Sequence, residues 1–512
     1  MSFPLPGTDL PVLKLNIPPS EGKASNVELN ETLLKHWVEK LSAEDLPAFL
    51  GAYQQPLYHF NHRSMPPLVR LKMLEIYRQP LNRMVMQLTS WELSQSARSI
   101  EQQNQLIDSL MQRLNELAIG YKITIMNAAA ENNTLTHNAV AKMAIHRAIE
   151  QLSYLIIHAY KFYRQPPAGI YHDLHQLFLA CLQAGIGDET PNMSLQQLKA
   201  EGSYQHRYIQ MMLLGICDPY SLRSNTVLKV YRMMGQLAPL AETQLHQNFN
   251  AVQGMFYINA KSDRLPEPGI YARPTESESV LVALNTKNIL NGIERLLKQA
   301  SSEAELDITL INQITPYLNS AYQRKQPRQP VTGAVAACVI QGFTSIHRQF
   351  APQDQCPLDT QQSWQILNKN DRGFLLSSPL NDKQHRLTVG ELVAMTEVLQ
   401  DQRAGVTRLA TIQWLRHDRQ GQTKLGLALL PGTAKPIHFR VPSQDQLQPA
   451  LLIPESVHPP FPASIICHSG VYRPEQILQL QSSKKFLNFT IHCKQLIDNY
   501  GDSERITIHY CE

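Results

Sequence analysis

Hydrophobic residues recur at helical spacing through the first half of the chain. Between about residues 28 and 250, apolar side chains return every three or four positions, and the polar links between these stretches are short. The clearest stripes are Ile107, Leu110, Leu114 and Leu117, and then Val140, Ala144, Ala148, Leu152, Leu155 and Ala159. Gly120 follows the first stripe, and we expect it to end that helix.

Three further helices are predicted in this half, at 173–184, 205–216 and 224–247. Long amphipathic helices joined by short links pack antiparallel, so the pattern predicts an all-α bundle or a stack of helix pairs. No repeat of fixed period is visible in the sequence, which leaves a solenoid unsupported.

The pattern changes near residue 250. GMFYINA and SVLVAL are typical of short strands, and two helices are expected at 286–300 and 303–319. From 330 to the end, short runs rich in β-branched and aromatic residues are broken by turn residues at regular spacing, which predicts small barrels or sandwiches. These runs include VTGAVAACVIQGF, WQILNK, GFLLSS, LATIQWLRH, KLGLALL, PIHFRV, ALLIPE, ASIICHS, FLNFTIH and RITIHY.

The chain is therefore predicted to be a multidomain α + β protein. A Pro-rich tail precedes a helical domain, a mixed linker region with two helices, a β-domain and a C-terminal β-rich domain. The expected boundaries are 1–24, 25–250, 251–320, 321–432 and 433–512.

Composition narrows the class of protein. Hydrophobic residues make up 43% of the 512 residues and charged residues 18%, which excludes disorder throughout. The net charge of +4 is too small to indicate nucleic-acid binding by itself. No apolar run reaches the roughly 18 residues of a membrane span, and the N-terminus lacks the features of a signal peptide. The seven cysteines form no CxxC pair, so we expect reduced thiols and a cytoplasmic protein.

Two segments at the junction of the helical and β parts carry candidate chemistry. The first is AYQRKQPRQP, which places Arg324, Lys325 and Arg328 on a short arm. Its prolines prevent a continuing helix, so the guanidinium groups are expected on an extended or turning arm before the first strand. Arginine binds phosphate and the O6/N7 edge of guanine bidentately.

The second segment is NKNDRGF, between two predicted strands. Asn368, Asn370 and the neighbouring aspartate favour a turn, and Gly373 permits a positive φ or the close approach of a ligand. Asparagine side chains present a donor and an acceptor together, as a guanine edge requires. Arg372 adds a cation to this turn.

The order of these features resembles the PilZ domain family. An RxxxR arm is followed by a strand, then by an Asn/Asp turn that ends in glycine, and later by strands such as ATIQWLRHD and KLGLALL. The resemblance covers about residues 320–432. It implies a PilZ-like six-stranded β-barrel that binds the bacterial second messenger cyclic di-GMP. Asn370 stands where the family usually has serine, and the gap from Arg328 to Asn368 is longer than usual, with an apparent insertion at 351–362.

By this resemblance, Arg324 and Arg328 would hold phosphate and guanine, Asn368 and Asn370 would contact a guanine edge, and Gly373 would shape the turn. Lys325 and Arg372 complete the expected ligand-binding set. No catalytic residue, metal ligand or cofactor is predicted. A histidine pair at His172 and His175 has no third ligand nearby in sequence, and an amphipathic helix explains it.

The predicted function is a non-enzymatic cyclic di-GMP effector in bacteria. The resemblance implies control of motility, surface attachment (biofilm) or type IV pili, with a protein partner bound by the helical domain. One alternative is a scaffold or adaptor whose degenerate barrel binds no nucleotide. Another, considered unlikely from the charge, is an RNA- or DNA-binding protein that uses Arg324, Lys325, Arg328, Lys369 and Arg372.

Overall fold

The computed structural model divides the chain into two compact units. Unit 1 comprises Met1–Phe162, Pro166–Pro219 and Asn225–Gln323, and unit 2 comprises Tyr163–Gln165, Tyr220–Ser224 and Arg324–Glu512. The structure describes residues 13–19, 30–41, 45–91, 100–131, 135–193, 198–199, 202–246, 252–271, 281–299, 308–320, 329–331, 335–351, 362–378, 387–398, 404–442, 446–457, 460–482 and 485–511.

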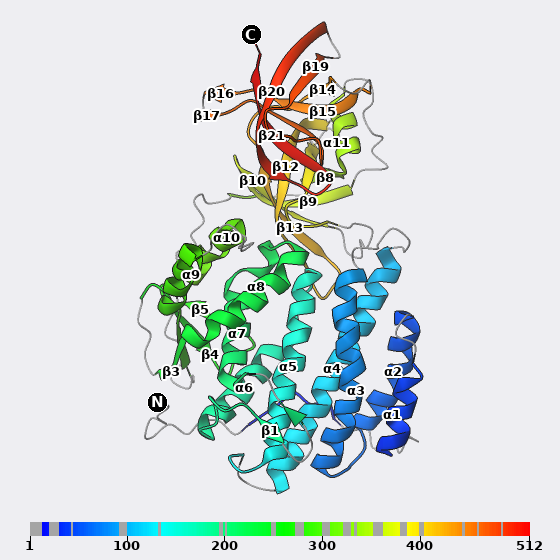
Figure 1. Cartoon of the computed structure of the whole chain (residues 1–512), viewed down its shortest axis with the longest axis vertical. Helices are drawn as coiled ribbons and strands as arrows, with labels where there is room; N and C mark the ends of the chain where they lie inside the picture. Colours follow the sequence, from blue (N-terminus) through cyan, green and yellow to red (C-terminus); the bar gives the residue numbers. More distant parts are fainter. Residues whose placement is uncertain are drawn as a thin grey trace. The chain divides into compact units, whose positions relative to one another are not determined.

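Unit 1 is mainly helical. Helices α3, α4 and α5 run side by side (Figure 1), and α5 is buried over most of its surface because neighbouring elements cover it. The helices are α1 (Glu31–Glu39), α2 (Leu46–Asn61), α3 (Pro67–Trp91), α4 (Ile100–Glu131), α5 (Ala139–Lys161), α6 (Ile170–Gln183), α7 (Tyr204–Ile216), α8 (Ser224–Leu237), α9 (Lys287–Gln299) and α10 (Ile308–Leu318). None of the helices in the described residues is both long and hydrophobic enough to cross a bilayer.

Gly120 does not end a helix, contrary to the expectation from the sequence. It lies inside α4, where a Cβ atom would come within 2.6 Å of Leu74 Cδ2 and 2.7 Å of Asn61 Oδ1. The missing side chain therefore lets α2 and α3 approach α4 closely. The helix that was expected to end at Gly120 continues to Glu131.

A small sheet accompanies the helices of unit 1. Its strand order is β3-β6-β4-β5, and β6 is buried along most of its length between its two neighbours. The strands are β3 (Glu242–His246), β4 (Met255–Asn259), β5 (Glu267–Pro268) and β6 (Leu281–Asn285), with a separate pair β1 (Asn192–Met193) and β2 (Leu198–Lys199). The helix expected at 224–247 is thus too long, because the chain leaves α8 through the 3₁₀ turn Ala238–Leu240 and enters β3.

Unit 2 begins with a six-stranded barrel, which we call barrel A. Each strand pairs with two neighbours in the ring order β8-β9-β10-β13-β12-β11, and the β9–β10 pairing closes it. The strands are β7 (Gln329–Pro330), which adds to β9 outside the ring, β8 (Ala336–Gln341), β9 (Gln362–Asn370), β10 (Gly373–Ser377), β11 (Leu392–Val398), β12 (Ala404–His417) and β13 (Thr423–Leu429). The expected six-stranded barrel is confirmed.

A second closed barrel, barrel B, follows. Its order is β14-β15-β18-β21-β20-β19, and the β14–β19 pairing closes it. The strands are β14 (Lys435–Arg440), β15 (Gln448–Ile453), β18 (Ser464–His468), β19 (Ile477–Ser482), β20 (Lys485–Asn499) and β21 (Ser503–Tyr510), with a side hairpin of β16 (Ser456–Val457) and β17 (Pro460–Phe461). The β-rich C-terminal region is therefore confirmed and is itself a barrel.

A short helix, α11 (Phe343–Phe350), packs where the two barrels meet. Phe343 and Ile346 lie in one buried cluster with Leu409 of barrel A and Ile466 of barrel B. The helix starts directly after β8, at Gly342, whose positive φ of 77° turns the chain out of the strand. The two barrels thus share a hydrophobic core inside unit 2.

Candidate functional site

The predicted Asn/Gly turn forms the β9–β10 hairpin of barrel A. β9 ends at Asn370 and β10 begins at Gly373, so the connection consists of Asp371 and Arg372, both exposed. The backbone N–H of Arg372 donates to Asn370 Oδ1 over 3.1 Å. A hydrogen bond from the backbone to an asparagine side chain two residues earlier stabilises a turn, and the sequence predicted a turn here. Asn370 therefore shapes the loop that presents Arg372.

Gly373 lies in a strand rather than in the turn. It pairs with Asn370 on one side and with Ala428 of β13 on the other, and it is buried. Gly373 is thus the first residue of β10 and is paired on both sides at the rim of barrel A. The carbonyl oxygen of Arg372 accepts the N–H of Leu429 over 2.9 Å, which anchors the turn to β13 as well.

The chain that directly follows the predicted arginine arm runs along this hairpin. Gln329 pairs with Lys369, Pro330 pairs with Asn368, and the N–H of Val331 donates to the carbonyl oxygen of Leu367 over 3.1 Å. Segments about forty positions apart in the sequence are thereby brought together. Arg324, Lys325 and Arg328 themselves lie outside the described residues, as does most of the apparent insertion.

Lys369 adds a positive charge that is held by a partner on another strand. Its Nζ atom lies 2.7 Å from Glu397 Oε2 of β11, and the two side chains are 43% and 22% exposed. Sequence reasoning missed Glu397 because the contact crosses from β9 to β11, between strands that are not neighbours in the ring. The pair reduces the positive charge that this rim offers to an anion.

One short segment from the helical half of the sequence, Tyr163–Gln165, contributes to barrel A. Tyr163 belongs to the buried core of barrel A, together with Trp364 and Phe374, and Arg164 forms a parallel bridge with His417 at the end of β12. Burial, together with the charge of Arg164, lowers the pKa of His417 to about 4, so its ring is neutral. Trp364 is a core residue, as expected, whereas Trp414 is only half-buried and covers Gly426.

His175, the second histidine of the pair in α6, is structural. His175 is buried, its Nδ1 lies 2.8 Å from the Tyr208 hydroxyl, and its Nε2 lies 2.9 Å from the carbonyl oxygen of Arg264. Burial lowers the pKa of His175 to about 4. Both ring nitrogens are engaged with protein atoms, so the ring has none to offer a metal. No group of three metal-binding side chains occurs among the described residues.

Comparisons with known proteins find matches in sequence. The model of a family described as "Cyclic-di-GMP receptor FimW, N-terminal domain" matches residues 32–247, the stretch that runs from α1 to the end of β3. The protein "Cyclic-di-GMP receptor FimW" of Pseudomonas aeruginosa is 23% identical over 538 aligned residues, which cover 89% of this chain and 87% of the relative. No solved structure matches. Over most of its length, the chain is thus similar to a protein that is named as a receptor for cyclic di-GMP.

Proposed function

We propose that this chain is a receptor for cyclic di-GMP and that it carries out no catalysis. Its nucleotide site would be the rim of barrel A, formed by the β9–β10 turn and the arginine arm. The observation that carries the proposal is the pairing of β7 with β9, which joins the end of the arm to the turn. The similarity to FimW and the resemblance to PilZ domains support the choice of ligand.

Chain connectivity explains why the arm belongs to this site. Arg328 is covalently bonded to Gln329, which pairs with Lys369 beside the turn, and consecutive Cα atoms are about 3.8 Å apart. A guanidinium group on so short a tether would reach a ligand seated on Asn368 and Arg372. We propose Arg324, Lys325 and Arg328 as its phosphate and guanine contacts, with Asn368 and Asn370 facing a guanine edge.

The ligand explains why several cations are needed. Cyclic di-GMP is a dianion with two guanines, and each charge-assisted hydrogen bond contributes about 1.5–3 kcal/mol. Ordering the arm costs on the order of 1–2 kcal/mol for each fixed residue. A single arginine would therefore not hold the ligand, whereas the arm and Arg372 acting together would. Pro327 and Pro330 lower the ordering cost because they restrict the free arm.

The output would be a protein partner bound by the helical unit. Unit 2 contains the short segments Tyr163–Gln165, which follows α5, and Tyr220–Ser224, which leads into α8, and Tyr163 lies in the core of barrel A. Ligand binding at barrel A would bias these connections and thereby the helices. The process controlled would be motility, surface attachment or pili, for which the support is the family resemblance alone.

Calorimetric titration of the full chain with cyclic di-GMP tests the proposal. We expect saturable binding by the native protein, no binding by Arg328→Ala, and at least tenfold weaker binding by Arg372→Ala. Arg473→Ala, at an exposed turn of barrel B, is the matched control and should bind as the native chain does. GTP should not compete.

The two alternative functions predict different results when the same protein is titrated with cyclic di-GMP and with single-stranded nucleic acid. Absence of binding at high ligand concentration would leave a scaffold with a degenerate barrel as the better account. Binding of single-stranded RNA or DNA that weakens steeply with salt, with no preference for the dinucleotide, would favour a nucleic-acid partner.

A further inference from the structure

An N-terminal segment, Leu13–Pro19, lies across the helices of unit 1. Leu13, Leu15 and Ile17 are half-buried, whereas Lys14 and Asn16 between them are exposed. Burial of every second side chain is the pattern of an extended peptide seated on a surface. We call this segment the strap.

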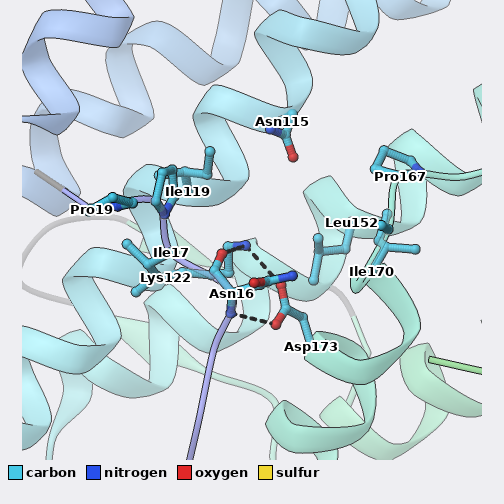
Figure 2. A pocket seen from close by; sticks show the side chains of 12 residues that line it. Asn16, Ile17, Pro19, Asn115, Ile119, Lys122, Leu152, Pro167, Ile170 and Asp173 are labelled. Atoms are coloured by element: carbon cyan, nitrogen blue, oxygen red, sulfur yellow. Dashed lines mark hydrogen bonds and ion pairs between the residues drawn. The ribbon is translucent and has the colours of Figure 1, made fainter. Parts of the chain in front are cut away.

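The strap is held through its main chain by a buried ion pair. The backbone N–H of Asn16 donates to Asp173 Oδ1 over 2.8 Å, and its carbonyl oxygen accepts from Lys122 Nζ over 2.5 Å (Figure 2). Lys122 on α4 and Asp173 on α6 also bond each other, at 2.8 Å, and their side chains are only 4% and 2% exposed. One carboxylate and one ammonium group thus bind both polar atoms of a single peptide residue.

The floor of the site accommodates a side chain at the same position. The Asn16 side chain packs directly on Gly169, the residue before α6, and a Cβ atom at 169 would overlap its Nδ2 atom. Gly169 also has a positive φ of 79°, which glycine adopts without strain. The groove therefore has room for the side chain of Asn16 as well as for its backbone.

A cavity of about 390 Å³ remains beside the two prolines of the strap. Asn115, Ile119 and Leu152 line it from α4 and α5, Pro167 and Ile170 border it near the start of α6, and it is partly open to solvent (Figure 2). The compact side chains of Pro18 and Pro19 border this space without filling it. A larger apolar side chain at either position would bury more surface, at about 25 cal/mol for each Å².

We propose that this groove docks an extended peptide of a partner protein and that the strap occupies it in cis as a competitor. The partner segment has apolar residues at alternate positions, followed by a bulky apolar side chain in place of Pro18 or Pro19. Main-chain hydrogen bonds supply affinity and the cavity supplies selectivity, as in other modes of extended-peptide recognition. The strap is tethered close to α1, so its effective concentration is on the order of mM. The proposal names the partner surface of the helical unit and does not require nucleotide binding.

A labelled synthetic peptide with the sequence of residues 11–20 (PVLKLNIPPS) is the probe. It is titrated by fluorescence anisotropy into the full-length protein and two variants. Asn16→Pro removes the N–H that Asp173 accepts, so the strap is released and the peptide should bind at least tenfold tighter than to the native chain. Asn16→Ala loses the same side chain but keeps the N–H, so its affinity should stay within about twofold of native.

The probe has its own control. A peptide with the same sequence, N-methylated at the asparagine amide, cannot donate to Asp173 and should not bind any of the proteins. Ile17→Asp releases the strap by a second route and should also raise the affinity for the unmodified peptide.

Five results would overturn the proposal. The peptide could bind all variants equally, could fail to bind Asn16→Pro, or could bind equally well when N-methylated. Loss of helical circular dichroism in both Asn16→Pro and Ile17→Asp would make the strap an integral part of the core. A native dimer formed by strap exchange, detected by light scattering, would identify a second copy as the occupant. If the chain bound no cyclic di-GMP, the interpretation of these peptide-binding results would not change.

Discussion

The hydroxyl oxygen of Tyr163 accepts the backbone N–H of Val389, which lies 226 positions later in the sequence, over 3.1 Å. The same oxygen accepts the N–H of Ser224, also over 3.1 Å. Tyr163, Ser224 and Val389 all belong to unit 2, so one side chain joins the short segments Tyr163–Gln165 and Tyr220–Ser224 to barrel A within that unit. Burial raises the pKa of Tyr163 to about 12, so the hydroxyl stays neutral at physiological pH.

Tyr163→Phe should loosen this junction. Two backbone N–H groups would lose their acceptor, and each buried unsatisfied donor costs about 1–3 kcal/mol. We expect hydrogen exchange at the Val389 and Ser224 amides to accelerate at least tenfold, measured by mass spectrometry. Tyr53→Phe is the control: the Tyr53 hydroxyl is buried with no hydrogen-bond partner among the described residues, so its removal should be neutral. Equal exchange rates in both variants would contradict this role for Tyr163.

Gly426→Ala should displace a tryptophan from the surface of barrel A. Gly426 on β13 pairs with Trp414 on β12, and a Cβ atom at 426 would overlap the indole nitrogen. Overpacking of this kind typically costs about 1–3 kcal/mol. Thermal unfolding should shift to lower temperature, with a change in tryptophan fluorescence. Gly51→Ala, in an exposed turn of α2 with no atom within 4 Å of the added Cβ, should instead stabilise by about 0.5–1 kcal/mol.

The strands of both barrels were predictable because their signal is local. Alternation and turn residues placed β9, β10 and β12 at the correct runs, and the helical stripes placed α4 and α5. The failures have different causes, of which only the one at Gly120 is a distant contact. Gly120 is inside α4 because Leu74 and Asn61 approach it there, and α8 stops early where Pro239 enters a 3₁₀ turn. The eight-residue α11 was missed because its helical pattern is short and directly follows a strand.

The candidate site was predictable only in its turn. The run NKNDRG gave the hairpin because asparagine and glycine mark turns in any fold. Glu397 and Tyr163 carry no local signal, since each reaches the site region or the barrel core through tertiary pairing. A Pro-rich tail was expected at residues 1–24, and the strap lies within it. Its attachment to Asp173 depends on a main-chain hydrogen bond that side-chain chemistry does not reveal.

Glu391 should make the protein less stable as the pH rises. Burial, with a contribution from the charge of Asp502, raises the pKa of Glu391 to about 7. The hydrogen bond that the Thr388 N–H donates to Glu391 over 3.0 Å opposes this increase, because it favours the charged carboxylate. The folded state therefore holds a proton that the unfolded state has lost between pH 4.5 and 7, so stability falls through this window. At about 1.4 kcal/mol for each pKa unit, the loss is about 3 kcal/mol at most.

Glu391→Gln removes this titration while keeping an oxygen for the Thr388 N–H. The variant should be more stable than the native protein at pH 8 and about equal to it at pH 4.5. Thermal midpoints measured at half-unit pH steps give the comparison. A native curve that rises with pH between 5 and 7, or a variant curve parallel to the native one, would contradict the assignment.

Removal of the Glu397 carboxylate should strengthen nucleotide binding at barrel A. Glu397 Oε2 holds Lys369 Nζ at 2.7 Å, beside the turn that presents Arg372. Glu397→Gln would remove a negative charge and release the ammonium group toward the ligand phosphates. Because one half-exposed charge interacts by about 1 kcal/mol or less, we expect affinity for cyclic di-GMP to rise about three- to fivefold at low salt and less at high salt. Glu475→Gln breaks a similar exposed pair with Lys494, at 2.8 Å on barrel B, and should leave binding unchanged. Weaker binding by Glu397→Gln would mean that the Lys369–Glu397 pair positions the turn rather than competing with the ligand.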